Sequence, residues 1–173
     1  WTGPVRTDLP GDGTHNAFAY SPAVVSEGTV YAAGQYNDGS KEIPCYWAGT
    51  SRTDLAGDGT HSASAYAIAI SGGTVYTTGR YWDGSIDIPC YWTGTTRTDL
   101  LGDNAVAYAI VVANGTVYTA GSCNGIPCYW IGTTRTDLGD AAHPGIAGAI
   151  AVSGSTVYTC LLYTSPSPRD RTR

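Results

Sequence analysis

One unit of 38 to 46 residues recurs along the chain and constrains its fold more than any other feature. Residues 28–55, 73–100 and 115–138 share Gly-Thr-Val-Tyr, then Pro-Cys-Tyr-Trp, then Arg-Thr-Asp-Leu, and a fourth copy begins at Ser155. Repeats of this length are single supersecondary units, each of which buries its apolar faces against its neighbours. The chain is therefore predicted to be a stack of similar units.

Each unit contains four predicted strands. In the second unit these are residues 65–71, 74–82, 86–94 and 96–100, which are rich in Val, Ile, Thr and Tyr and are separated by Gly-containing turns. The third unit is shorter at two links, and deletions of this kind belong in surface connections. Four short antiparallel strands per unit are typical of a β-propeller blade.

We therefore predict an all-β chain and a β-propeller over residues 1–159. The three full blades and two half-blades are expected at residues 21–55, 66–100, 108–138, 1–9 and 148–159. Complete propellers have four to eight blades, so we expect a fragment of a larger ring. Pairing of the two half-blades into a closed four-bladed ring is an alternative. A parallel β-helix is a second alternative, but it would not need hairpin turns such as Asp83-Gly84.

Residues that recur at fixed positions are predicted to be structural. The tryptophans and the first tyrosine of each unit should fill the space between sheets, and the Arg and Asp of each Arg-Thr-Asp are two apart and share a strand face, where they can pair. These residues are Trp47, Trp92, Trp130, Tyr31, Tyr76, Tyr118, Arg52, Asp54, Arg97 and Asp99.

The cysteines Cys45, Cys90 and Cys128 also occur once per unit. Equivalent positions in neighbouring blades are too far apart for a disulfide, so we expect buried, unpaired thiols. A two-residue turn at residues 124–125 would set Cys123 opposite Ile126 and away from Cys128.

Both ends of the chain depart from the repeat. Trp1 begins in the middle of a unit, and residues 160–170 leave the pattern at Cys160. The stretch Cys-Leu-Leu-Tyr-Thr-Ser-Pro-Ser-Pro-Arg-Asp resembles a translated sequencing adapter. We therefore expect residues 160–173 to be a non-native tail without fold information; a genuine Pro/Ser/Arg-rich tail is the alternative.

One end of the predicted sheets is a candidate binding rim. In a four-stranded meander the turn between the second and third strands lies at the same end as the link between units. Aromatic rings beside carboxylates there could stack on a sugar and hydrogen-bond its hydroxyls. The alternative is that the carboxylates only form turns and the rings are partly buried caps. The candidate residues are Tyr36, Asp38, Tyr81, Trp82, Asp83, Asp12, His15, Asp58 and His61.

Neither metals nor catalytic groups are predicted. Asp54 and Asp58 are four residues apart, wider than the alternating oxygens of a calcium loop. His15, His61 and His143 lie on different units, which would hold them too far apart for a shared zinc ion. The chain contains no nucleophile elbow, zinc-protease helix, P-loop or dinucleotide fingerprint, so no catalytic residue and no cofactor is expected.

The charge and hydropathy pattern excludes two classes of partner. The formal net charge is −5, which argues against a nucleic-acid partner, because such a partner would need clustered basic residues. No apolar run reaches 18 residues, so no transmembrane segment is predicted.

The pattern TVYxxGxY…G…CYWxGTxRTDL resembles the tandem propeller repeats of bacterial cell-surface proteins and lipoproteins, which are loosely kelch-like. This resemblance implies an extracytoplasmic or cell-surface location and a non-enzymatic role in binding or scaffolding, with an unknown protein or glycan as ligand. The alternative is part of a propeller enzyme, a glycan hydrolase or lyase. An enzyme should have one unit that breaks the repeat with unique rim residues, whereas these copies are mostly uniform.

Overall fold

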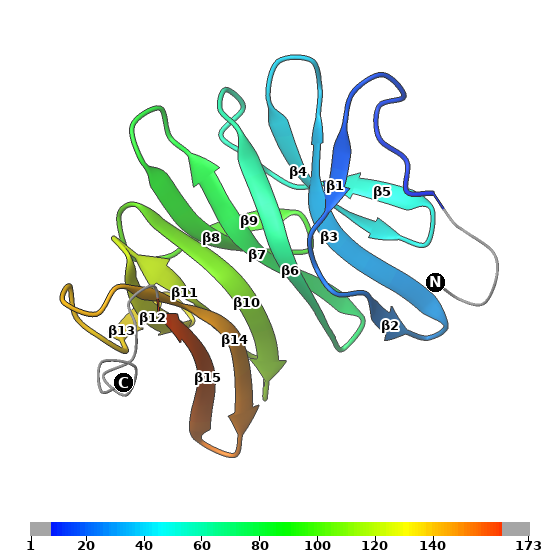
Figure 1. The fold of residues 1–173 in the computed structure, drawn as a ribbon. Helices are drawn as coiled ribbons and strands as arrows, with labels where there is room; N and C mark the ends of the chain where they lie inside the picture. The colour runs from blue at the N-terminus through cyan, green and yellow to red at the C-terminus, as the bar shows by residue number, and fades with distance from the viewer. Residues whose placement is uncertain (1–7, 164–173) are drawn as a thin grey trace, which may run out of the picture.

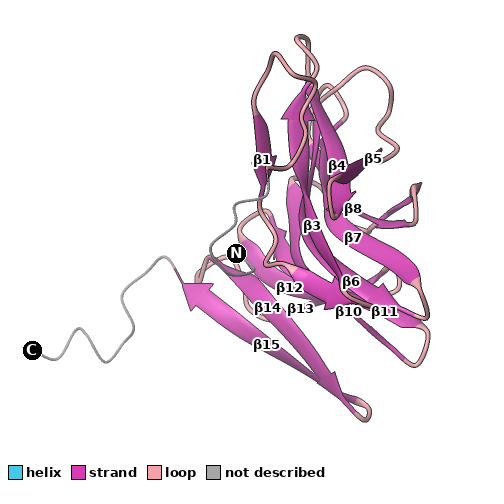
Figure 2. Ribbon diagram, turned by 90° about the vertical axis from the view of Figure 1, so that its right-hand side faces the viewer, coloured by secondary structure: helices cyan, strands magenta, loops and turns pink. Residues whose placement is uncertain are grey.

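The computed structural model describes residues 8–163, which form antiparallel β-sheets and contain no helix (Figure 2). The sheets follow one another in chain order, from the blue and cyan first sheet to the orange and red last one (Figure 1). The all-β prediction is confirmed. Because the described residues include no helix at all, none is long and apolar enough to cross a membrane.

The second and third sheets are complete four-stranded meanders, and each strand pairs with the next along the chain. The second sheet consists of β6 (Ala63–Ser71), β7 (Thr74–Trp82), β8 (Asp87–Thr93) and β9 (Thr96–Asp99). The third sheet consists of β10 (Ala105–Ala113), β11 (Thr116–Cys123), β12 (Ile126–Ile131) and β13 (Thr134–Asp137).

The first sheet has the same order, but its first strand is split in two. In the break between its two parts, the backbone N–H groups of Tyr20 and Ser21 both donate to the Ala33 carbonyl. Pro22, which has no N–H to donate, follows in the same break. The strands are β1 (Ala17–Ala19), β2 (Val24–Ser26), β3 (Thr29–Asn37), β4 (Glu42–Ala48) and β5 (Ser51–Asp54).

The last sheet contains two strands, β14 (Gly145–Ser153) and β15 (Thr156–Tyr163). The expectation that fold information ends at residue 159 is wrong for residues 160–163, because Cys160 pairs with Ala149 and Tyr163 pairs with Gly145. Backbone pairing continues there although the side chains have left the repeat. Of the half-blade expected at residues 1–9, residues 1–7 lie outside the described part, and residues 8 and 9 are not in a strand.

A bulge in the first strand explains why these strands begin earlier than predicted. Ala65 pairs with Gly79 but Ala67 pairs with Thr78, so Tyr66 is an extra residue, and β10 and β14 shift register in the same way. A Cβ on Gly79 would lie 1.9 Å from the carbonyl oxygen of Ser64. Gly79 therefore has no room for a side chain, and Gly34 and Gly121 are under the same constraint, whereas the last sheet has Leu161 at the equivalent position.

The tryptophans join each sheet to the linker that precedes it. Trp47, Trp92 and Trp130 are buried, and their indole N–H groups donate to the carbonyls of Pro10, Ala56 and Leu101 at 2.9, 2.8 and 2.8 Å. Pro10, Ala56 and Leu101 each directly follow the leucine of an Arg-Thr-Asp-Leu sequence.

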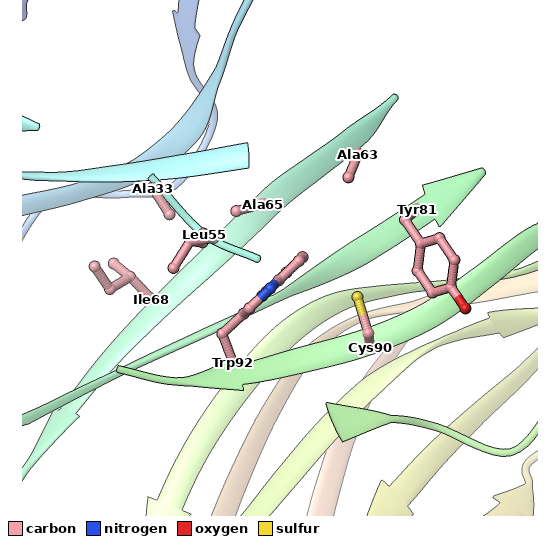
Figure 3. Packing of buried hydrophobic residues seen from close by; sticks show 8 residues of the cluster. All are labelled: Ala33, Leu55, Ala63, Ala65, Ile68, Tyr81, Cys90 and Trp92. Atoms are coloured by element: carbon pink, nitrogen blue, oxygen red, sulfur yellow. The ribbon is translucent and has the colours of Figure 1, made fainter. Parts of the chain in front are cut away.

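That leucine packs into the same layer as the tryptophan. Figure 3 shows Leu55 from the first unit with Trp92, Ala65 and Cys90 of the second sheet, and Ala33 of the first sheet belongs to the same cluster. Leu100 and Trp130 repeat the arrangement in the third sheet. Tyr31, Tyr76 and Tyr118 are only half-buried, and Tyr31 contacts the cluster around Trp92.

The repeated cysteines lie in these layers. Cys45, Cys90 and Cys128 are fully buried and free, and burial raises the pKa of Cys45 and Cys128 to about 12. Cys123 pairs with Ile126 across the two-residue turn, as its spacing predicts.

Candidate functional site

The turns and linkers that the sequence assigns to one rim do lie together. A Cβ on Gly39 would be 3.0 Å from the His15 ring, and one on Gly84 would be 3.0 Å from the His61 ring. Lys41, in the turn of the first sheet, donates to the carbonyl of Gly59 in the next linker. Each second-to-third-strand turn therefore packs against an inter-sheet linker.

Three of the linkers, at residues 12–15, 58–61 and 140–143, are closed by an Asp-x-x-His motif. Asp12 accepts the backbone N–H groups of Thr14 and His15, and its second oxygen is 2.5 Å from His15 Nδ1. The His15 side chain, followed by these backbone donors, holds the pKa of Asp12 well below its usual range. The carboxylate therefore has its hydrogen bonds within its own loop.

Asp58 and His61 repeat this arrangement, with Asp58 Oδ2 2.5 Å from His61 Nδ1. Partial burial would raise the pKa of Asp58, but hydrogen bonds from His61 and Thr60 outweigh it and leave the pKa well below normal. Asp140 and His143 form a more exposed pair at 2.9 Å.

Asp38 and Asp83 act as turn formers. Asp38 Oδ1 accepts the backbone N–H groups of Ser40 and Lys41, and Asp83 accepts those of Ser85 and Ile86. These bonds, led by the one from the last residue of each turn, lower the pKa of both carboxyl groups. The geometry matches the turn-forming alternative; a ligand-binding role for these residues remains a prediction.

The structure differs from the sequence expectation at Tyr36 and Tyr81, which are buried and do not project from the rim. Tyr81 donates to Asp99 at 3.2 Å, and the Arg97 guanidinium lies 3.8 Å from the Tyr81 ring centre. Arg97 in turn bonds to Asp99 at 2.8 Å.

The same cluster forms from Tyr36, Arg52 and Asp54, with the ion pair at 2.9 Å. Each tyrosine is two residues from the glycine of its strand, Gly34 or Gly79. Strand alternation therefore places it on the same face as that glycine, which points inward. Of the three predicted rim aromatics only Trp82 is exposed, at 40%.

A concave groove that the sequence analysis missed lies along the first strands of the sheets. Its volume is about 450 Å³, and it receives residues from all four sheets. Tyr20, Tyr66 and Tyr108 form a row along it, with ring centres 5.4 and 5.7 Å apart. Gly148 takes the equivalent place in the last sheet, and Ile68, Ile110 and Ile150 add aliphatic surface.

A half-buried cation lies beside the middle of the row. Arg80 Nε donates to the Tyr66 hydroxyl at 3.0 Å, and its Nη1 is paired with Asp87. Burial raises the pKa of Tyr20 and Tyr108, so both phenols are neutral donors at physiological pH. The groove thus offers aromatic faces, aliphatic walls and a few hydroxyl groups.

Tyr66 and Tyr108 are the bulged residues of their strands, and Tyr20 lies in the break between β1 and β2, which explains why they were missed. The first strands look like continuous apolar runs, and alternation cannot place a residue that is left out of the pairing. A usable signal was the recurrence of Ala-Tyr at residues 19–20, 65–66 and 107–108, always ahead of the same hairpin.

The third sheet departs from the others at one buried position. Cys123, which pairs with Ala105, takes the place that Tyr36 and Tyr81 have in the first and second sheets. Arg135 Nη1 donates to the Cys123 sulfur at 2.7 Å. Burial raises the pKa of Cys123, so it is a protonated thiol.

Within residues 8–163, no three metal-ligating side chains gather in one place. Comparison with known proteins finds no matching family model and no matching curated protein. The arrangement of side chains is therefore the basis for assigning a function.

Proposed function

We propose that the four sheets are blades of a β-propeller and that this region is a non-enzymatic binding module of an extracytoplasmic bacterial protein. The propeller assignment is supported by consecutive antiparallel meanders whose first strands line a common groove. The resemblance of the repeat to cell-surface and lipoprotein propellers supports the location. The kelch-like character and the number of blades in the ring belong to the same proposal.

The observation that carries the binding role is the tyrosine row of the groove. Exposed aromatic surface gathered in a concavity is typical of ligand sites, and the exposed fraction of Tyr20 is 45%. The ligand class that fits is a neutral glycan, because a pyranose offers an apolar face to a ring and hydroxyls to its edges. Anionic polymers fit poorly with a chain of net charge −5.

A binding role also agrees with the state of the ionisable groups. The arginine–aspartate pairs recur in three units and the Asp-x-x-His loops in three linkers, and the two charged or polar side chains of each pair bond to one another. A catalytic group is needed once, in one place, with a pKa matched to its task. Repeated, mutually paired groups are better explained as structural elements of a binding scaffold.

A glycan array probed with the whole chain tests this proposal. We expect saturable binding to neutral glycans that falls at least tenfold in Tyr66→Ala and in Tyr108→Ala. Tyr66→Phe, which keeps the ring, should retain most of the binding, and Trp82→Ala on the rim should retain all of it. Near-ultraviolet circular dichroism checks that each variant is folded. The absence of any hit, or hits that survive in both folded alanine variants, would refute the proposal.

A further inference from the structure

The aromatic surface of the groove continues past the groove at the first sheet. The Phe18 ring stacks on the Tyr20 ring, with ring centres 6.2 Å apart and an angle of 13° between the ring planes. Tyr20 contacts Tyr66, and Tyr66 contacts Tyr108, so four rings follow one another in contact. Phe18 lies in β1, two residues closer than Tyr20 to the linker that precedes this strand. The path of rings therefore turns at Tyr20 toward the linker end of the first sheet.

Phe18 breaks the repeat. It is the only phenylalanine of the chain, and the residues at the same distance before Tyr66, Tyr108 and Gly148 are Ser64, Val106 and Ile146. Ser64 is buried, whereas Phe18 is 47% exposed. A large apolar side chain that occurs once and remains exposed is not explained by the packing that the units share.

The exposed Phe18 ring lies on the side of the first sheet that faces the second sheet. Phe18 pairs with Gln35, so the two side chains are on the same face of the sheet. Ala33, two residues from Gln35, is on that face as well, and it belongs to the cluster around Trp92 of the second sheet. Phe18 is thus exposed although the sheet that packs on its face is in place.

The lining of the groove favours an uncharged ligand with polar edges. Its described residues are aromatic, aliphatic, proline or glycine, and none of them is acidic or basic. The nearby Arg80 is already paired with Asp87. A pyranose offers an apolar face to each ring and hydroxyl groups to the phenols, whereas a lipid chain would bury the phenol hydroxyls without a partner.

The spacing of the rings fits a linear chain of sugars. The steps between ring centres are 5.4, 5.7 and 6.2 Å. These steps are close to the advance per residue of an extended chain of pyranoses. A single sugar would use only one of the four rings, and a branched glycan would not follow a path one ring wide.

We propose that Phe18 forms a further sugar subsite next to Tyr20, and that the ligand is an extended neutral oligosaccharide with one sugar on each of the four rings. This inference rests on the binding function proposed above and adds the length and the course of the ligand to it. The oligosaccharide leaves the groove over Phe18, toward the linker end of β1. Phe18 is therefore a specificity-determining residue that selects ligands of at least four sugars.

Titration of the whole chain with two size series, cello-oligosaccharides and N-acetylchito-oligosaccharides, tests the subsite. We expect at least one series to bind, with the tetrasaccharide at least fivefold tighter than the trisaccharide. In Phe18→Ser the two should bind equally well, and the trisaccharide should bind as it does to the unmodified chain. Phe18→Tyr, which keeps the ring, should retain the difference. Leu101→Ala is the control for an exposed apolar residue outside the groove and should also retain it.

The single phenylalanine also allows a direct measurement. A chain that incorporates para-fluorophenylalanine has one fluorine signal, which reports on Phe18 alone. Saturation with the tetrasaccharide should shift this signal in fluorine NMR. An unshifted signal in a chain that binds the tetrasaccharide would refute the subsite.

Three results of the titration would also overturn the proposal. The first is that neither series binds, and the second is that the unmodified chain binds the trisaccharide and the tetrasaccharide equally. The third is that Phe18→Ser weakens the binding of both sugars alike, because Phe18 would then only support Tyr20. Array hits confined to short or branched glycans would refute this subsite and leave the proposed binding function in place, whereas an array without any hit would refute both.

Discussion

The second and third sheets share one half of their structure and differ in the other. In both, a buried tryptophan bonds to the preceding linker, and a glycine sits opposite the bulge. At the turn end, the second sheet has the buried Tyr81 and the Asp58–His61 loop. The third sheet has the smaller Cys123 there and a turn shortened to residues 124–125.

The comparison shows that the residues that pack consecutive sheets together are distinct from the residues that form the turn ends. The tryptophan–leucine layer joins consecutive units, so it cannot change in one unit without affecting the next. Apart from the bonds of Lys41 and Glu42 to the next linker, the hydrogen bonds at the turn end are made within one loop or one sheet. That end can therefore lose residues with less effect on its neighbours. We therefore expect substitutions at layer positions to lower the stability by similar amounts in the two sheets, and substitutions at the turn ends to lower it by different amounts.

The largest effect is expected from Trp92→Ala and Trp130→Ala. Each removes a buried indole from a layer between units, and each should lower the free energy of unfolding by about 3–5 kcal/mol. Chemical denaturation of the two variants measures this, with Trp82→Ala as the exposed control, which should cost little. Losses that differ by more than a factor of two between Trp92 and Trp130 would break the equivalence of the two sheets.

A smaller loss is expected from Gly79→Ala and Gly121→Ala. The added methyl group would lie 1.9 Å from a carbonyl oxygen of the bulged strand, so the backbone must move, at a cost of about 1–3 kcal/mol. Gly57→Ala is the matched control, since the nearest atom to a Cβ there is 3.8 Å away. Thermal unfolding of all three variants gives the comparison. An unchanged stability in Gly79→Ala would contradict the close approach of Gly79 to the backbone of β6.

Tyr81→Phe tests the turn end of the second sheet. It removes the hydroxyl that donates to Asp99 but keeps the ring under Arg97, so the expected loss is about 0.5–1.5 kcal/mol. Tyr36→Phe should behave alike, because its hydroxyl donates to Asp54. Denaturation midpoints measure both variants. A loss as large as that of Trp92→Ala would place Tyr81 in the inter-unit layer instead.

The smallest effect is expected from Asp58→Asn. The pKa of Asp58 is lower in the folded chain than the value of about 3.9 expected in the unfolded chain. The stabilisation is therefore present above about pH 4 and is lost as the pH falls toward the folded pKa. Asp58→Asn should lower the melting temperature by about 1–2 °C at pH 7 and not at strongly acidic pH.

Asp103→Asn is the matched control for this change, because the linker into the third sheet has no histidine after its aspartate. We expect no change in melting temperature at either pH. A pH-independent loss in Asp58→Asn would show that the Asp58–His61 loop stabilises the fold by packing and not through its charge.

Much of the fold could be predicted from the repeat itself. Val-Tyr strands, Asp-Gly or Asn-Gly turns and the spacing of Trp47, Trp92 and Trp130 indicate the order of strands, because each signal is local and recurs from unit to unit. The starts of β6 and β10 could not be predicted. Their first residues, Ala63 and Ala105, lie beyond a bulge, and the glycine that permits the bulge is on another strand.

The candidate site was predicted less well. Proximity of the turns and linkers follows from the topology of a meander, and it holds at Gly39 and Gly84. The orientation of Tyr81 depends on its register relative to Gly79, which alternation could have given. The tyrosine row could not have been found in this way, because Tyr66 and Tyr108 meet only when separate sheets pack together.

In each of the three units, a buried indole N–H donates to a carbonyl of the preceding linker and so holds the sheet to that linker. Hydrogen exchange of the indole N–H groups, followed by NMR, tests this directly. The account predicts slow and similar exchange for Trp47, Trp92 and Trp130, and fast exchange for the exposed Trp82. Exchange of any of the three as fast as that of Trp82 would contradict it.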